Sequence, residues 1–219
     1  MGSSFNVADF VTKLAVILFA ISFHESAHAW MALKFGDSTA KDLGRISLNP
    51  IRHIDPFGSI VLPILLYFSS GLLFGYAKPT PVRLERTKNP RLADLAVSAA
   101  GPLSNLLLAI VGVIALIVLQ RLSPGERVRE SVMGPIVQIA VAFVSLNVGL
   151  GVFNLIPIPP LDGSWVLAAL IGEPARVFFQ QIGRFGFLIL LVLSYTGILG
   201  RMMNPVMNVI FRLIRAALA

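Results

Sequence analysis

The stretch from Ile21 to Trp30, ISFHESAHAW, decides how the rest of the chain is interpreted. It contains the pattern H-E-x-x-H and lies within an apolar run from about Phe10 to Leu33. Side chains four positions apart on a helix share one face, so His24 and His28 are placed to chelate one metal ion. Glu25 lies beside them, where its carboxylate can take a proton from a water bound to that metal.

A purely structural interpretation of this motif is the alternative, because the same pattern also occurs on the solvated faces of soluble helices. The apolar surroundings favour the metal site. Ionisable side chains within hydrocarbon cost several kcal/mol unless they have a partner or a metal. The sequence therefore predicts an intramembrane metal centre, with zinc as the ion that two imidazoles at this spacing typically bind.

The composition indicates a membrane protein of the all-α class. Of the 219 residues, 56% are hydrophobic and 13% are charged, whereas a soluble domain carries about 25% charged residues. Apolar runs recur along the chain, and we expect about five to six transmembrane helices, with a re-entrant or extended segment near the active site. We expect a single integral membrane domain over 1–219, with core helices at about 8–34, 92–120 and 133–171.

The net charge of +7 does not indicate a nucleic-acid partner. The basic residues lie in the connections between apolar runs, as the positive-inside rule predicts for a protein in a lipid bilayer. The chain has no cysteine, which excludes disulfides and thiolate metal ligands. The first apolar run holds the histidine pair and has no basic segment before it, so we expect a retained span rather than a cleaved signal peptide.

The connection at 35–56 is interrupted by glycine, asparagine and proline, which argues against a continuous helix. Four Lys or Arg lie from Lys34 to Arg52, and none precedes Lys13. This asymmetry predicts an external N-terminus and a cytoplasmic connection. His53, the third histidine, could be a further ligand, a gating residue, or a surface or turn histidine, and we do not include it among the metal ligands.

The apolar stretch 57–75 could span the membrane or enter and return. A full span would place the basic segment 76–91 outside, against the positive-inside rule, so we favour the re-entrant form. Segment 76–91 is rich in proline and basic residues. It could pair edge-on with an unfolded substrate strand, or it could be a solvated loop at anionic lipid headgroups. We leave both interpretations open.

The span at 133–155 ends in the sequence NLIPIPPLDG, from Asn154 to Gly163. Its three prolines cannot continue a regular helix. Hydrolytic zinc sites typically take three protein ligands and keep one position for water, and we choose the Asp162 carboxylate as the third ligand. Asp162 could instead cap a short helix at 163–171.

Three further segments, 92–120, 184–200 and 204–217, are apolar or mostly apolar. Asn105, within 92–120, is expected to hydrogen-bond another helix. Residues 184–200 are expected to form the last clear span. The segment 204–217 carries Arg212 and Arg215, and it could be a short span or an amphipathic helix at the interface.

With these motifs in place, the chain resembles the site-2 protease family of intramembrane zinc metalloproteases. Three motifs of that family occur in order: H-E-x-x-H, A-G-P-x-x-N at 100–105 and N-x-x-P-x-P-x-L-D-G at 154–163. The resemblance implies His24, His28 and Asp162 as ligands of Zn²⁺ and Glu25 as the catalytic base.

The resemblance also bears on substrate binding and location. It implies that Asn154 contacts the substrate or helps to stabilise an oxyanion, and we place Asn105 with it as a substrate-binding residue. The sequences LGRISLNPIRHIDPFG and FGYAKPTPV are similar to small prokaryotic members without a PDZ domain. We therefore expect a multi-pass protein of the prokaryotic plasma membrane, in which the membrane domain or a partner selects the substrate.

The function predicted on these grounds is that of a zinc-dependent endopeptidase. We expect it to hydrolyse transmembrane protein substrates in regulated intramembrane proteolysis. A metal-binding transporter and an inactive protease-like scaffold are the alternatives. A transporter should show polar residues across the full membrane thickness, whereas the polar set here is compact and near one face, which favours the enzyme.

Overall fold

The computed structural model of the chain describes residues 7–62, 64–65, 75–122 and 133–218, and these residues form helices and irregular segments without a strand. The predicted all-α class is therefore confirmed for the part of the chain that is described. The predicted re-entry at 57–75 lies partly outside it, because residues 63 and 66–74 are not described.

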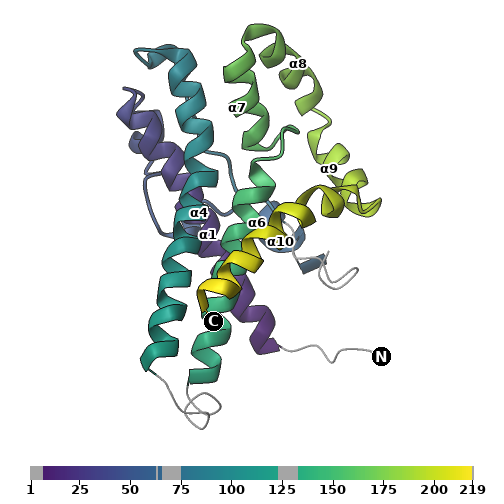
Figure 1. Cartoon of the computed structure of the whole chain (residues 1–219). Helices are drawn as coiled ribbons and strands as arrows, with labels where there is room; N and C mark the ends of the chain where they lie inside the picture. Colours follow the sequence, from purple (N-terminus) through teal and green to yellow (C-terminus); the bar gives the residue numbers. More distant parts are fainter. Residues whose placement is uncertain (1–6, 63, 66–74, 123–132, 219) are drawn as a thin grey trace.

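Three long helices form the centre of the molecule (Figure 1): α1 (Val7–Lys34), α4 (Pro90–Leu122) and α6 (Met133–Asn154). Each is long and apolar enough to cross a membrane. The ends of α1 and α4 agree with the predicted core helices to within two residues, whereas the predicted core segment 133–171 consists of two helices, because α6 ends at Asn154 before the proline-rich sequence and a second helix begins at Asp162. Helix α4 packs against both α1 and α6, so residues from all three helices can meet around it.

The helices after the proline break are shorter. Helix α7 (Asp162–Ile171) packs on α4, and α8 (Glu173–Gly183) and α9 (Gly186–Tyr195) meet at a bend of 74°. The described residues thus contain three candidate spans, or four if the bent pair is one broken span, fewer than the five to six expected. The predicted continuous span at 184–200 is wrong, because α9 ends at Tyr195 and Gly197 follows with a φ of 72°.

Helix α10 (Ile198–Leu218) includes the whole of 204–217 and crosses the bundle obliquely in Figure 1. One face, with Met203, Met207, Ile210 and Ile214, packs on the apolar cluster between α4 and α6. Its arginines, Arg201, Arg212 and Arg215, are exposed. The helix is therefore amphipathic and is not among the candidate spans.

The connection between α1 and α4 is irregular and folds back against α1. It contains the short helices α2 (Thr39–Asp42), η1 (Pro50–Arg52), η2 (Pro56–Val61) and η3 (Leu84–Arg86). An irregular segment at 75–83 runs beside the first part of this connection, because Tyr76 donates its N–H to Gly58 O and Lys78 donates its N–H to His53 O.

A buried carboxylate fixes the far end of this segment. Asp37, directly after α1, accepts hydrogen bonds from the Arg83 N–H at 2.7 Å and from the N–H of Thr39 at 2.9 Å. Burial alone would raise the pKa of Asp37, but these hydrogen bonds outweigh it and hold the pKa below its usual range. The segment 75–83 is thereby held along α1, where Glu25 lies.

Candidate metal centre

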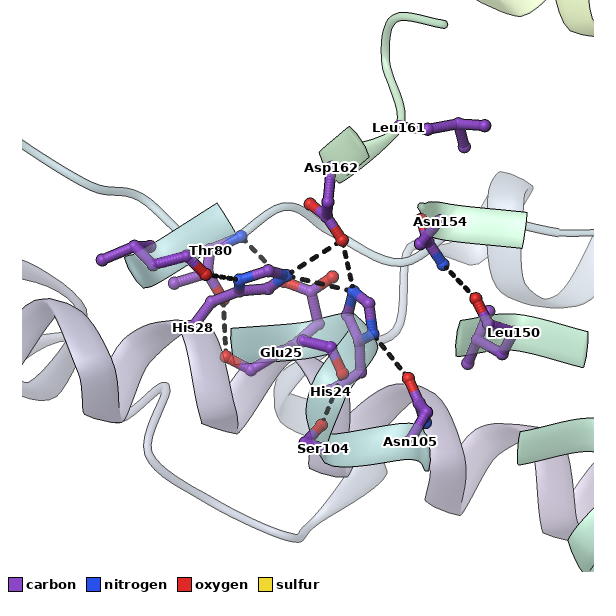
Figure 2. Close-up of polar contacts among 12 residues, drawn as sticks. His24, Glu25, His28, Thr80, Ser104, Asn105, Leu150, Asn154, Leu161 and Asp162 are labelled. Carbon is purple, nitrogen blue, oxygen red and sulfur yellow. Dashed lines mark hydrogen bonds and ion pairs between the residues drawn. The ribbon is translucent and has the colours of Figure 1, made fainter. Parts of the chain in front are cut away.

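The predicted ligands converge at one point, although they are far apart in the sequence (Figure 2). Helix α1 contributes His24 and His28, and the first residue of α7 contributes Asp162. The two Nε2 atoms are 3.0 Å apart. Oδ2 of Asp162 lies 3.0 Å from Nε2 of His24 and 3.4 Å from Nε2 of His28. Among the described residues, this is the one group of such side chains placed to share a metal ion.

The proline break positions the carboxylate. Helix α7 begins at Asp162, its N-cap residue is Leu161, and none of the side chains that the structure describes caps it. The alternative in which Asp162 is a helix cap is therefore not what the structure shows. Gly163 permits the sharp turn, since a Cβ there would overlap the carbonyl oxygen of Leu155. The chain after α6 thus returns the Asp162 side chain towards α1.

Hydrogen bonds on the other side of each ring decide which nitrogen faces the centre. Nδ1 of His28 lies 2.6 Å from the Val97 carbonyl oxygen, which can only accept, so this nitrogen carries the proton and donates. Nδ1 of His24 donates in the same way to Oδ1 of Asn105, also at 2.6 Å. In the neutral form, which is the form that binds a metal, each ring therefore directs the lone pair of Nε2 towards Asp162.

This donor set fits zinc. With both rings neutral, two lone pairs and a carboxylate oxygen face one another, and Oδ2 of Asp162 is buried without a hydrogen-bond donor among the residues that the structure describes. Such an arrangement is repulsive unless a cation lies among the three atoms. A tetrahedral zinc ion with bonds of about 2.0–2.1 Å separates its ligands by about 3.3–3.4 Å, and the observed separations of 3.0 and 3.4 Å are close to this value.

The A-G-P motif provides the space in front of the histidines. A Cβ at Gly101 of α4 would lie 2.6 Å from Nε2 of His24 and closer still to Nε2 of His28. Any side chain at position 101 would therefore occupy the place where these atoms meet. The glycine lets α4 approach α1 at the level of the ligands.

Glu25 lies beside the cluster with its carboxylate held by the irregular segment. Oε2 of Glu25 accepts hydrogen bonds from the Thr80 N–H at 3.0 Å and from the Thr80 hydroxyl at 2.8 Å (Figure 2). From the sequence, segment 76–91 could be a strand-pairing segment or a solvated loop, and no pattern indicates a role for Thr80. The contact depends on how the segment folds back on α1.

A cavity of about 670 Å³ opens onto the cluster. Its walls include Glu25, Asn154, segment 75–77, Asp94 and Arg176. Asp94 and Arg176 form an ion pair between α4 and α8. Asn154 donates its Nδ2 to Leu150 O at 3.0 Å, so its side chain is anchored at the cavity wall.

The structure places Asn105 away from the cavity. Its side chain is completely buried, lies behind His24 and is absent from the cavity wall. Direct contact with a substrate, as expected from the sequence, would need an exposed surface that this side chain lacks. The expected hydrogen bond to another helix is present, since Asn105 bonds His24 on α1 and Asn147 on α6.

His53 is buried but lies outside the cluster. Its Nε2 donates to Ser47 O at 2.8 Å, and the Ser26 hydroxyl oxygen is 3.5 Å away. The side chain is 1% exposed, so it is not a surface histidine. It joins the connection after α1 to the face of α1 that carries Ser26.

Comparison with known proteins points to the same chemistry. A family model described as peptidase family M50 matches residues 12–194. The chain is 40% identical over 195 residues to the Bacillus subtilis protein named "Putative zinc metalloprotease YwhC", covering 88% of this chain and 85% of the relative. A relative from Mycolicibacterium smegmatis with the same description, Rip2, is 32% identical over 198 residues, covering 89% and 71% of the two chains. No solved structure matches the chain.

These matches confirm the predicted enzyme class, a metallopeptidase, and the predicted zinc cofactor, for which the structure supplies two histidines and an aspartate. They also agree with several apolar helices of membrane-spanning length in one multi-pass protein. Since the family match covers most of the sequence, the chain belongs to peptidase family M50.

Proposed function

We propose that this protein is a zinc endopeptidase that cleaves transmembrane protein substrates within the bilayer or at its edge. The observation that carries the proposal is the convergence of His24, His28 and Asp162 beside Glu25, at the end of a cavity between apolar helices. His28 lies six residues before the end of α1 at Lys34, which corresponds to about 9 Å along the helix. This shallow depth supports access for water.

The residues divide the chemistry between them. His24, His28 and Asp162 would hold the zinc ion, which lowers the pKa of a water and polarises the scissile carbonyl group. The Glu25 carboxylate takes the proton of the attacking water and passes it to the leaving amine. Thr80 holds Oε2 of Glu25 with two donors, which restricts the orientation of the base. Asn154, at the cavity wall, is placed to contact the substrate.

A transmembrane substrate must unwind before cleavage, because helical hydrogen bonds hide its backbone. Segment 75–83 is suited to hold an unwound strand. The N–H groups of Tyr76, Lys78 and Thr80 are bonded within the protein, and Pro79 and Pro81 have no N–H. The free edge of the segment therefore offers mainly carbonyl oxygens, and the backbone N–H groups of an extended substrate could donate to them.

The setting of the reaction is also part of the proposal. The basic connections and the relatives from bacteria support a location in the plasma membrane of a prokaryote. There the enzyme would act in regulated intramembrane proteolysis. Lys78, exposed on segment 75–83, would lie near anionic headgroups if the connection after α1 is cytoplasmic.

The decisive experiment replaces the base and leaves the ligands in place. Glu25→Gln should bind zinc like the wild type and lose cleavage of a membrane substrate by about 10²–10⁴-fold, the usual contribution of general acid–base catalysis. Glu85→Gln, the same change at an exposed position of η3, is the matched control and should cleave normally. Cleavage by Glu25→Gln at the wild-type rate would refute the proposal.

Comparing membrane proteomes then identifies the substrate. Fragments released by the wild type and absent with Glu25→Gln should derive from transmembrane proteins. Zinc-dependent metal uptake by purified protein in vesicles, without any released fragment, would instead support the transporter.

A further inference from the structure

We propose that Asn147 of α6 is a positioning residue for the metal site, although it touches neither the ligands nor the cavity. It sets the orientation of the Asn105 amide, and this amide sets which nitrogen of His24 carries the proton. The inference rests on the zinc site of the proposed function and is independent of the identity of the substrate.

A continuous series of hydrogen bonds connects α6 to the ligand. Nδ2 of Asn147 donates to the Phe143 carbonyl oxygen at 2.9 Å, so Oδ1 of Asn147 points the other way and accepts. Nδ2 of Asn105 donates to this oxygen at 3.0 Å and to the Ala20 carbonyl oxygen at 3.2 Å. Oδ1 of Asn105 is thereby turned to Nδ1 of His24.

The opposite orientation of Asn105 would be incompatible with the metal site. A flipped amide would place its oxygen against Oδ1 of Asn147 and the Ala20 carbonyl oxygen, which are both acceptors. Its NH₂ group would face Nδ1 of His24 and favour the tautomer with a proton on Nε2. That proton would then point at Asp162 and His28, where the lone pair is needed to bind zinc.

Because both asparagines are buried, the orientation of the Asn105 amide depends on its partners within the protein. The side chains of Asn105 and Asn147 have no exposed surface, so bulk water does not replace a lost partner. A buried donor or acceptor without a partner costs about 1–3 kcal/mol. Each hydrogen of the Asn105 NH₂ group has its own acceptor, one on α1 and one on α6. Removing the acceptor on α6 leaves one hydrogen unpaired and weakens the preference for the productive orientation.

The test measures zinc affinity directly, by competition with a chelator. Asn147→Leu has a similar size and lacks the acceptor, and it should weaken zinc binding about tenfold, at the low end of the 10–100-fold known for outer-shell partners. Gln138→Leu, the same loss of an amide at an exposed position of α6, is the matched control and should bind zinc like the wild type. Unchanged affinity in Asn147→Leu would overturn the inference.

A second variant background, Asn105→Asp, separates an effect on the orientation of the side chain at position 105 from an effect on packing. In Asn105→Asp, a carboxylate presents an oxygen to His24 in either orientation, so no flip can occur. Adding Asn147→Leu to this background should change zinc affinity less than twofold. An equal loss of affinity in both backgrounds would show that Asn147 acts only through packing, and would overturn the inference.

Two further measurements keep the test decisive. Thermal unfolding of the metal-free variants shows whether Asn147→Leu folds. If it does not fold, Asn147→Ala replaces it in both backgrounds, because the smaller side chain cannot overfill the site. A wild type that binds no zinc would refute the proposed function itself. A wild type that binds zinc, with Asn147→Leu unaffected, would refute only the role of Asn147.

Discussion

All three histidines of the chain are buried, yet only two of them form a metal centre. His24 and His28 are 5% and 7% exposed, and His53 is 1% exposed. The paired rings donate from Nδ1 and turn both Nε2 atoms to a common point with a carboxylate. His53 donates from Nε2 to Ser47 O, and its Nδ1 has no hydrogen-bond partner among the described residues.

The difference shows that burial alone does not identify a ligand. What separates the two environments is where the ring proton is fixed and what the other nitrogen faces. At the metal centre, acceptors behind the rings, on Val97 and Asn105, direct the lone pairs inwards. At His53, the proton is fixed on Nε2, which donates to Ser47 O, and the side chain belongs to no group of metal-binding side chains among the described residues.

The largest effect is expected from His28→Ala. Loss of one of three protein ligands should weaken zinc binding by more than the 10–100-fold that an outer-shell partner contributes. Metal content after purification and chelator competition measure it. His53→Ala is the matched control and should retain zinc. Equal loss of zinc from both variants would contradict the distinction between the two environments.

Gly101→Ala should have the next largest effect. The new Cβ would displace one or both rings, so zinc affinity should fall about 10–100-fold, as when ligand orientation is lost. Gly149→Ala on α6 is the control, since its Cβ would meet only the end of the Met207 side chain, at 4.0 Å. If Gly101→Ala binds zinc normally, the close approach of α4 does not shape the site.

Thr80→Val should affect catalysis and leave the metal in place. The variant keeps the size of the side chain and the backbone N–H but removes the hydroxyl that reaches Oε2 of Glu25. We expect kcat to fall about tenfold, less than the 10²–10⁴-fold that the base itself contributes, with zinc affinity unchanged. A fall in zinc affinity equal to the fall in kcat would show that Thr80 supports the ligands instead of the base.

The smallest effect on the metal is expected from His53→Phe. This change removes the hydrogen bond to Ser47 O, which still accepts from the Ser26 hydroxyl, so it should lower the free energy of unfolding by about 0.5–1.5 kcal/mol, the net contribution of a typical hydrogen bond. Zinc affinity should stay within twofold of the wild type. Denaturant unfolding and chelator competition on the same sample measure both, and a large loss of zinc would make His53 part of the metal centre.

The sequence predicts the parts of the site that follow from local geometry. The helical period alone predicts that His24 and His28 share one face of a helix. The three prolines predict that the helix ends before Asp162. The same rules located the three long helices. Asp162 as the third ligand also drew on the resemblance to a family.

Other features depend on contacts between distant segments, which local patterns do not reveal. Thr80 reaches Glu25 across more than fifty residues, and Asn147 reaches Asn105 between two helices. The break after Tyr195, at Thr196 and Gly197, lies between the apolar helix α9 and the apolar start of α10, so hydropathy indicates one span over 184–200. Asn105 was assigned to the substrate because sequence alone does not show which face of α4 meets α1.

The return of Asp162 to the histidines also has a consequence for folding. A bound ion would join α1 to the start of α7 and close a loop of more than a hundred residues, which contains the whole of α4 and α6. Closing so long a loop removes conformational freedom from the unfolded chain, as a covalent cross-link does. The ion would therefore stabilise the entire central bundle. Removing it with a chelator would lower the stability of the fold as well as stop the reaction.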